Sequence, residues 1–328
     1  MKIYHPDSIE RFIVGGVKVS AQQQRKAFEK VGVEYTTDFT LDYDIMHLNF
    51  LGPLALPLLF ISKLLGKKTV VHAHSTGDNL EDTLAFSSIW GPIGKKYYQF
   101  IFRHSDQVIA VSDYSKELLE EREVGDVITL SNGVDNDVLD GYNEIEVPDE
   151  YSEEAFRVVN LAQVFELKGL DTFIEVGESM PDAEFTWFGP RHEKLNPKET
   201  IEKIDDTPEN VSFPGFIDDK RIPFRIGDVY LFPSHEETQG ISVLEAAYCE
   251  MPLVVRDIEA FEGWLKHREN CLKAETTDEF IEHVKTLRDD EELREKIAAN
   301  AREMAEHHTL EKIGERLQKM YREVLSSD

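Results

Sequence analysis

The chain has 328 residues, enough for two domains of ordinary size that each bury a core. Its 64 Asp and Glu outnumber its 36 Lys and Arg, and the resulting net charge of −28 argues against nucleic acid as a partner, because phosphate binding needs clustered cations. The acids are spread over both halves, which favours a surface adapted to concentrated salt over an acidic patch for one cationic partner.

Two series of short β-type runs alternate with helical segments. The first series occupies residues 44–49, 68–75, 106–112 and 126–133. The second occupies residues 157–163, 183–189, 210–215, 229–234 and 252–257. Helical patterns lie between them, at residues 20–31, 113–123, 170–179, 242–250 and 276–289. Strands that alternate with helices form parallel sheets covered on both faces, so the predicted fold class is α/β with two doubly wound domains.

A domain boundary is expected in residues 141–155, which show little periodicity and many acids. This predicts an N-terminal domain at 1–150 and a C-terminal domain at 151–308. The last segment, 309–328, holds a helix with an apolar stripe, which we expect to pack back toward the N-terminal domain. Ligands of such sheets bind beyond the carboxyl ends of the strands, so residues at strand ends are the best site candidates.

The cysteine usage, the charged N-terminus and the short apolar stretches of the sequence favour a cytoplasmic protein. Cys249 and Cys271 fit no metal spacing and suggest no disulfide framework, as expected in a reducing compartment. The first twelve residues carry charges where a signal peptide needs an apolar run. The longest apolar stretch, residues 51–65, contains two prolines and a lysine, and it is shorter than the about 20 residues that span a bilayer.

The stretch SHEETQGISVLEA places Glu237 and Glu245 on either side of a strand-to-helix junction at Gly240. Glycine lets the backbone approach a ligand, and the N–H groups of Ile241 and Ser242 would form an anion site at the helix start. A capped helix is the competing interpretation, because Ser242 and Glu245 fit the S-x-x-E capping box and Glu245 would lie in the first turn. The cap explains neither Glu237 nor Gly240.

The longer pattern FPSHEETQGISVLEAAYCEMPLVVRD resembles the E-x7-E signature of retaining family-4 glycosyltransferases. Four further segments resemble family motifs in family order: a glycine loop (VGGV, 14–17), a strand ending in a histidine (VVHAHST, 70–76), a turn (LSNGVD, 130–135) and a phosphate-binding segment (FELKGLDTFIEV, 165–176). The resemblance covers nearly the whole chain. It implies the GT-B fold, in which two Rossmann-like domains face a central cleft, with a nucleotide sugar as donor substrate and neither a cofactor nor a metal ion.

Carried over to this sequence, the resemblance implies that Glu237 holds hydroxyls of the donor sugar and that Glu245 holds the ribose hydroxyls. Both roles suit a carboxylate, which accepts hydrogen bonds from paired hydroxyls. The backbone amides near Gly240, Ile241 and Ser242 would meet the diphosphate or the sugar.

The resemblance implies three more donor-site residues. Lys168 would neutralise the β-phosphate of the leaving nucleotide, although without the other motifs a solvated surface lysine in a loop is the favoured interpretation. His74 would contact the sugar across the cleft. His72 and His47 lie on similar strands, and a structural role is the alternative interpretation for these histidines. Gly16 would let the first loop approach the phosphates, and a plain turn glycine is its alternative.

One position departs from the family. An arginine usually stands five residues before the lysine, and here that position is Gln163. A neutral amide donates hydrogen bonds but supplies no countercharge. Arg191 and Arg256 are candidates for the missing charge, and a non-catalytic sugar-nucleotide-binding protein stays an alternative.

The acceptor is indicated by the sub-pattern of residues 236–265, which resembles the branch that includes monoglucosyldiacylglycerol synthases and related lipid glucosyltransferases. Residues 51–104 carry six Lys and Arg against three acids, mixed with Leu, Phe, Trp and Tyr. Such a mixture suits a face that meets anionic lipid, although core helices with surface lysines are the alternative. The leading hypothesis is a retaining hexosyltransferase that moves glucose from a UDP-sugar to a membrane lipid, peripheral on the inner face of the membrane. A glycan or another soluble acceptor is the runner-up.

Overall fold

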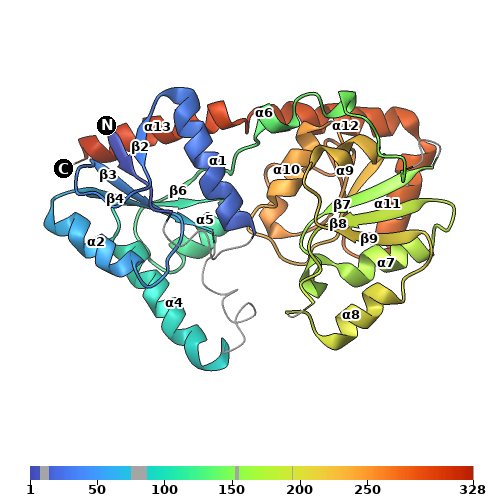
Figure 1. Cartoon of the computed structure of the whole chain (residues 1–328), viewed down its shortest axis with the longest axis horizontal. Coiled ribbons are helices and arrows are strands. Elements are labelled where there is room, and N and C mark those ends of the chain that lie inside the picture. Colours follow the sequence, from blue (N-terminus) through green and yellow to red (C-terminus); the bar gives the residue numbers. More distant parts are fainter. Residues whose placement is uncertain (8–14, 75–86, 152–154, 194, 328) are drawn as a thin grey trace. The chain divides into compact units, whose positions relative to one another are not determined.

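The computed structural model describes residues 1–7, 15–74, 87–151, 155–193 and 195–327, with the backbone alone for 87–93. The chain divides into two compact units (Figure 1). Unit 1 comprises Met1–Gly133 and His308–Asp328, and unit 2 comprises Val134–His307. Each unit contains one six-stranded sheet whose paired strands are parallel.

The sheet of unit 1 has the strand order β2-β1-β3-β4-β5-β6. Its strands are β1 (Lys2–Tyr4), β2 (Glu34–Thr36), β3 (Ile45–Leu48), β4 (Lys68–Ala73), β5 (Gln107–Ala110) and β6 (Val127–Thr129). The described helices of this unit are α1 (Gly16–Val31), α2 (Ala55–Leu64), α4 (Ser87–His104), α5 (Asp113–Glu120) and α13 (Leu310–Ser326). Every residue of β3 and β5 is buried, as expected for inner strands of a sheet covered on both faces.

The C-terminal helix α13 packs against α1 in unit 1, and the two lie side by side in Figure 1. The approach is close, because a Cβ on Gly314 would lie 2.6 Å from the carbonyl oxygen of Ala27. Leu317 and Tyr321 are fully buried in one cluster with Phe28. Burial of this apolar stripe is the reason that residues 308–328 group with unit 1 although they are distant in sequence.

The sheet of unit 2 has the order β12-β11-β10-β7-β8-β9. Its strands are β7 (Arg157–Leu161), β8 (Glu184–Phe188), β9 (Val211–Gly215), β10 (Val229–Phe232), β11 (Leu253–Arg256) and β12 (Leu272–Ala274). Its α-helices are α6 (Asn136–Leu139), α7 (Leu170–Glu178), α8 (Lys198–Asp205), α9 (Arg221–Ile226), α10 (Ile241–Tyr248), α11 (Thr277–Asp289) and α12 (Glu291–Glu306). Short 3-10 turns are η2 (Tyr142–Glu144), η3 (Glu166–Lys168) and η4 (Glu259–Phe261).

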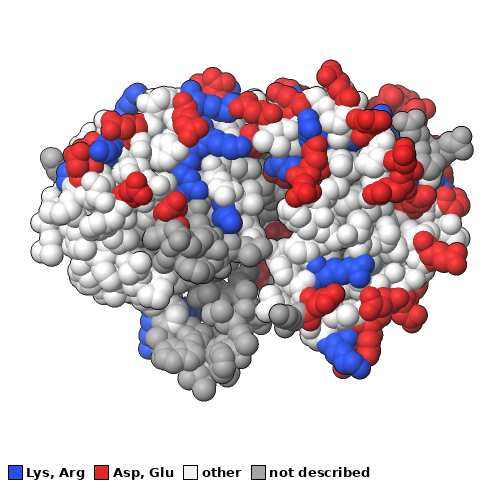
Figure 2. All heavy atoms as spheres, in the orientation of Figure 1, with Lys and Arg blue, Asp and Glu red and all other residues white. Residues whose placement is uncertain are grey.

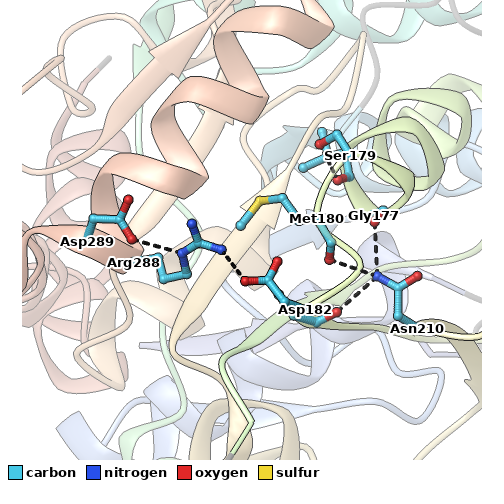
Figure 3. A network of polar contacts seen from close by, with 9 residues as sticks. Gly177, Ser179, Met180, Asp182, Asn210, Arg288 and Asp289 are labelled. Carbon is cyan, nitrogen blue, oxygen red and sulfur yellow. Dashed lines mark hydrogen bonds and ion pairs between the residues drawn. The ribbon is translucent and has the colours of Figure 1, made fainter.

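A polar network ties the end of α7 to the amino ends of β8 and β9 (Figure 3). The side-chain amide of Asn210 donates to three carbonyl oxygens, those of Gly177, Met180 and Ala183. Arg288, in the last turn of α11, donates to Asp182 and Asp289, both at 2.9 Å. The network lies at the edge of the sheet opposite to the strand ends where ligands bind, so it supports the sheet rather than the site.

The division between the units falls after Gly133, not near residue 150 as the sequence predicts. Residues 134–150 belong to unit 2 because α6 packs against α10 and η2 packs against α9. The Tyr248 hydroxyl donates to Asp140 at 2.8 Å, and Leu139 is fully buried. These short turns carry no periodicity, so a composition argument places the boundary too late.

Candidate active site

The loops after β7 and β10 touch each other at the carboxyl edge of the unit 2 sheet, where these two strands are parallel neighbours. The His235 N–H donates to the carbonyl oxygen of Leu167 at 2.9 Å. A Cβ on Gly169 would lie 2.2 Å from the carbonyl oxygen of Pro233, and the φ angle of Gly169 is +81°. Only glycine permits this approach, which brings Lys168 next to the E-x7-E loop.

Lys168 and Glu237 form an ion pair at this contact. The Lys168 Nζ lies 2.5 Å from the Glu237 Oε1, and the two side chains are 24% and 11% exposed. Water screens a partly buried pair less than an exposed one, so the pair restrains both side chains. The structure thus brings together two residues that the sequence assigns separately to the sugar and the phosphate; those roles stay predictions.

Helix α10 begins directly after Gly240, which is its N-cap with a φ of +84°. Ser242 is therefore the second helical residue and Glu245 the fifth, and no side chain caps the helix. The capping-box interpretation is wrong, because the left-handed glycine starts the helix two residues before the serine. Since the first N–H groups of a helix lack intrahelical partners, those of Ile241 and Ser242 remain the predicted anion site.

Glu245 is held by Lys220 rather than by its own helix terminus. The Lys220 Nζ lies 2.6 Å from the Glu245 Oε1, and the side chains are 26% and 6% exposed. Lys220 is the N-cap residue of α9, 25 positions earlier in the chain. A buried carboxylate needs such a partner, because burial without one disfavours its charged form.

In unit 1, polar side chains gather where β1, β3 and β4 end as neighbours. They are His5 after β1, His47 in β3, Asn49 after β3, His72 in β4 and His74 after β4. The ring of His72 stacks on that of His74 with centroids 4.6 Å apart, and on that of His47 at 5.7 Å. Burial, together with neighbouring His5, lowers the pKa of His74 to about 3, and burial lowers the pKa values of His47 and His72 well below their usual range. These rings are neutral at pH 7.

Two predicted motifs of unit 1 lie partly outside the described residues. Of VGGV, residue 14 is not described, and of VVHAHST, residues 75 and 76 are not. Gly16 is the first residue of α1, and a Cβ there would meet no described atom within 4 Å. The left-handed conformation at this turn belongs to Gly15, with a φ of 109°, so the steric argument for glycine applies to Gly15 and the role of Gly16 stays a prediction.

The chain matches known proteins along most of its length. Residues 34–138 match the family model for Glycosyltransferase Family 4, and residues 143–304 match that for Glycosyl transferases group 1. A processive diacylglycerol alpha-glucosyltransferase of Acholeplasma laidlawii is 34% identical to the chain, and the alignment covers 94% of each protein. The chain belongs to the family-4 glycosyltransferases.

Other comparisons agree with this family. An alpha-galactosylglucosyldiacylglycerol synthase of Streptococcus pneumoniae is 30% identical over 49% of this glycosyltransferase and 45% of its own length. Among solved structures, Anabaena HepE in complex with UDP-glucose superimposes with a TM-score of 0.77 at 17% identity, covering 98% of this chain and 100% of that one. The family resemblance and the GT-B fold predicted from the sequence are thereby confirmed.

Both arginines proposed to supply the missing countercharge of this glycosyltransferase donate hydrogen bonds to other parts of the protein. Arg256 donates to the carbonyl oxygens of Pro233 and Glu275 and to the Thr172 hydroxyl, at 2.8 to 3.0 Å. Arg191 donates through two nitrogens to the carbonyl oxygen of Phe213. Both guanidinium groups therefore hold loops of unit 2 together. The role of either arginine as a countercharge beside Gln163 stays a prediction.

Sequence reasoning missed Lys220 and Asn49 in this glycosyltransferase. Lys220 follows Asp218 and Asp219, which the sequence presents as a solvated loop, and nothing local connects it to Glu245. Asn49 had a usable signal, because a polar residue at the end of a buried strand lies on the ligand edge of a parallel sheet. Across the described residues, no three His, Cys, Asp or Glu side chains gather in a way that could hold a metal ion.

Proposed function

We propose that this glycosyltransferase is a retaining enzyme that transfers glucose from a UDP-sugar to diacylglycerol or a glycosylated diacylglycerol. The observation that carries the proposal is the alignment over 94% of both chains with a protein named as a diacylglycerol alpha-glucosyltransferase. The pneumococcal relative is also named for a glycosylated diacylglycerol. UDP-glucose carries its sugar in the α configuration, so an α-linked product would mean retention of configuration.

The residues of unit 2 fit a nucleotide sugar. In our proposal the Glu237 carboxylate accepts hydrogen bonds from sugar hydroxyls, and Lys168 beside it offsets phosphate charge as the glycosidic bond breaks. The amides at the start of α10 meet the diphosphate, and Glu245 accepts the ribose hydroxyls. Because a lysine and a helix start offset the phosphate charge, we propose that the nucleotide sugar reacts as a substrate and that the reaction needs no cofactor.

An open hollow at the carboxyl ends of β8 and β9 offers a place for the uracil base. It is lined in part by Arg191, His192, Phe213 and Phe216. Phe216 is 74% exposed, which is unusual for so large an apolar side chain. An exposed ring at the ligand edge of the sheet suits stacking with a base. Replacing Phe216 by alanine should therefore weaken UDP binding.

Helix α2 supplies the surface that we propose to contact the membrane. Five large apolar side chains on and near it are exposed: Leu54, Phe60, Leu64, Leu65 and Phe100. The described parts of this region, 51–74 and 87–104, carry six Lys and Arg and no acid, and the surface over α2 shows few acids in Figure 2. Apolar side chains beside cations suit reversible attachment to anionic lipid at the inner face of the membrane. No described helix has the length and apolar character needed to cross a bilayer.

The deciding experiment is a transfer assay in concentrated salt, the condition that we propose for a surface with a net charge of −28. Radiolabelled UDP-glucose is incubated with the protein and vesicles that contain diacylglycerol, and the lipid product is digested with α- and β-glucosidases. The proposal predicts a labelled lipid that only the α-glucosidase cleaves. UDP release with soluble sugars alone would overturn the lipid acceptor, and UDP binding without turnover on any acceptor would support the non-catalytic alternative.

Variants of the two glutamates test their assigned roles. Glu237→Ala should abolish transfer while largely sparing UDP binding, whereas Glu245→Ala should weaken UDP binding. Equal losses from both variants, matched by equal losses of stability, would contradict separate roles for the two carboxylates.

Membrane attachment is tested by co-sedimentation with anionic vesicles. The double variant Phe60→Ser with Leu64→Ser should release the protein from vesicles. Leu325→Ser, which changes an exposed leucine on α13, serves as the matched control and should bind as the wild type does. Unchanged sedimentation of the double variant would contradict the assignment of this surface.

A further inference from the structure

The donor and acceptor roles in the hydrogen-bond network around His74 can be assigned one after another, beginning with Ser20. Its hydroxyl donates its single hydrogen to the Asn132 Oδ1 at 2.5 Å. The Ser20 oxygen therefore accepts from the Gln24 Nε2 at 3.3 Å, and the same nitrogen reaches the His72 Nδ1 at 2.9 Å. The Gln24 amide nitrogen is thereby committed to these two partners, and its Oε1 faces the Asn49 side chain.

Asn49 connects this network to His74. Its Nδ2 donates to the Gln24 Oε1 at 2.8 Å, which fixes the orientation of the Asn49 amide. The His5 Nε2 lies 2.8 Å from the same Nδ2 and 3.1 Å from the Gln24 Oε1. The Asn49 Oδ1 then lies 2.8 Å from the His74 Nε2. An amide oxygen can only accept, so the hydrogen of this bond belongs to the His74 Nε2.

The other nitrogen of the same ring is then an acceptor. His74 is neutral at pH 7, since burial and neighbouring His5 lower its pKa to about 3. A neutral imidazole has one N–H, so with the hydrogen on Nε2 the Nδ1 presents a lone pair. The parallel ring of His72, 4.6 Å away, restrains the plane of His74. Tautomer and ring plane are thus set by one buried network that includes Gln24, Asn49 and His72.

We propose that Asn49 is a positioning residue of the transfer reaction: by accepting the hydrogen on the His74 Nε2, it makes the His74 Nδ1 the acceptor of a hydroxyl hydrogen from the hexose. This inference rests on the proposed function, in which His74 contacts the donor sugar. His74 then orients a neutral hydroxyl and brings no positive charge to the sugar. Asn49 acts through His74 and needs no contact with the substrate.

The tautomer is read by nitrogen-edited NMR of protein with labelled histidine, where an N–H nitrogen and an unprotonated nitrogen have distinct shifts. The wild type should show the His74 Nε2 protonated and its Nδ1 unprotonated. In Asn49→Ala the ring should populate both tautomers. In Asn49→Asp, which keeps the side-chain volume, a carboxylate beside the ring should favour the doubly protonated form. Unchanged His74 signals in both variants would overturn the proposal.

A mutant cycle tests whether the effect on catalysis passes through His74. Asn49→Ala should lower kcat at least about tenfold, with a smaller change in the KM for UDP-glucose. In a His74→Ala background the same change should have little further effect, within about twofold, because the residue through which it acts is gone. Equal fold losses in both backgrounds would refute the positioning role.

Gln107 provides the matched control. It is a buried amide of the same sheet, in β5, and its side chain donates to the carbonyl oxygens of Val108 and Asp126 rather than to the histidines. Gln107→Ala should leave the His74 signals unchanged, and similar shifts there would also count against the proposal. If the wild type transfers no glucose while its NMR signals follow the prediction, then the proposed function fails and the tautomer assignment stands.

Discussion

Replacing Lys220 by methionine should destabilise unit 2 by about 2–3 kcal/mol. The change removes the cation 2.6 Å from a Glu245 side chain that is only 6% exposed. Removing one partner of a fully buried ion pair costs about 3–5 kcal/mol, because the remaining charge is left uncompensated. Lys220 is 26% exposed, so water can enter where its ammonium was, and the lower end of this range or slightly less applies.

The matched control is Lys203→Met. Lys203 lies 2.7 Å from Asp171 and 3.3 Å from Glu166, but the three side chains are 44%, 55% and 39% exposed. An exposed pair contributes at most about 1 kcal/mol, so this variant should be nearly as stable as the wild type. Both variants remove an ammonium group that lies within 2.7 Å of a carboxylate, but Lys203 pairs with two exposed acids and Lys220 with one buried acid.

The assay is urea unfolding at constant high salt, followed by tryptophan fluorescence, which reports on unit 2 through the fully buried Trp187. Lys220→Met combined with Glu245→Gln should be more stable than Lys220→Met alone, because no isolated charge remains. Equal effects of Lys220→Met and Lys203→Met would refute the reasoning. So would additive losses in the double variant.

Three further predictions follow from the structure. Gly169→Ala should cost at least about 2 kcal/mol of stability, because the new Cβ would overlap a carbonyl oxygen of the loop after β10. Gly215→Ala, also at positive φ but with no atom within 4 Å of its Cβ, should cost about 1 kcal/mol. Urea unfolding compares the two variants, and equal losses would contradict the loop contact. The folded-state pKa of His74, about 3, lies below the unfolded value, so its contribution to stability is complete above about pH 6.5 and is lost as the pH falls toward 3, by up to about 1.4 kcal/mol per pH unit. Unfolding free energies at pH 5 to 8 should therefore fall less steeply with acid in His74→Ala, and parallel profiles would contradict the assigned shift. Cys249 and Cys271 are free and buried, and burial raises both thiol pKa values, so iodoacetamide should label them only after unfolding; labelling of the native protein would contradict their burial.

Most inner strands of both sheets could be predicted from the sequence because apolar residues dominate them, although β3 contains His47 and β5 begins with Gln107. Residues 44–49, 106–112 and 229–234 contain β3, β5 and β10, each buried at every position. The inner strand β1 and the edge strands β2 and β12 were not predicted, because three residues are too few to show a period of two. The sequence indicates α2 only as an apolar stretch, because the helix has almost no polar side.

The candidate site shows the same limit. Glu237 and Lys168 could each be selected from motifs, but the motifs stand 69 positions apart, and nothing in either one indicates that the side chains pair. The capping-box pattern at Ser242 and Glu245 misled because a four-residue motif is blind to a left-handed glycine two residues earlier that starts the helix first.

The sequence by itself determined the family, the alternation of strands and helices, and the residue types at the strand ends, because these depend on local periodicity and on motifs a few residues long. Only the tertiary structure decided which of those residues meet: Lys168 with Glu237, Lys220 with Glu245, and Asn49 with His74. Each of these contacts joins segments far apart in the chain, and each exists because parallel strands deliver their loops to one edge of a sheet. Pairing, burial and the tautomer of a neutral histidine are properties of that edge, and they follow from packing rather than from the order of residues along the chain.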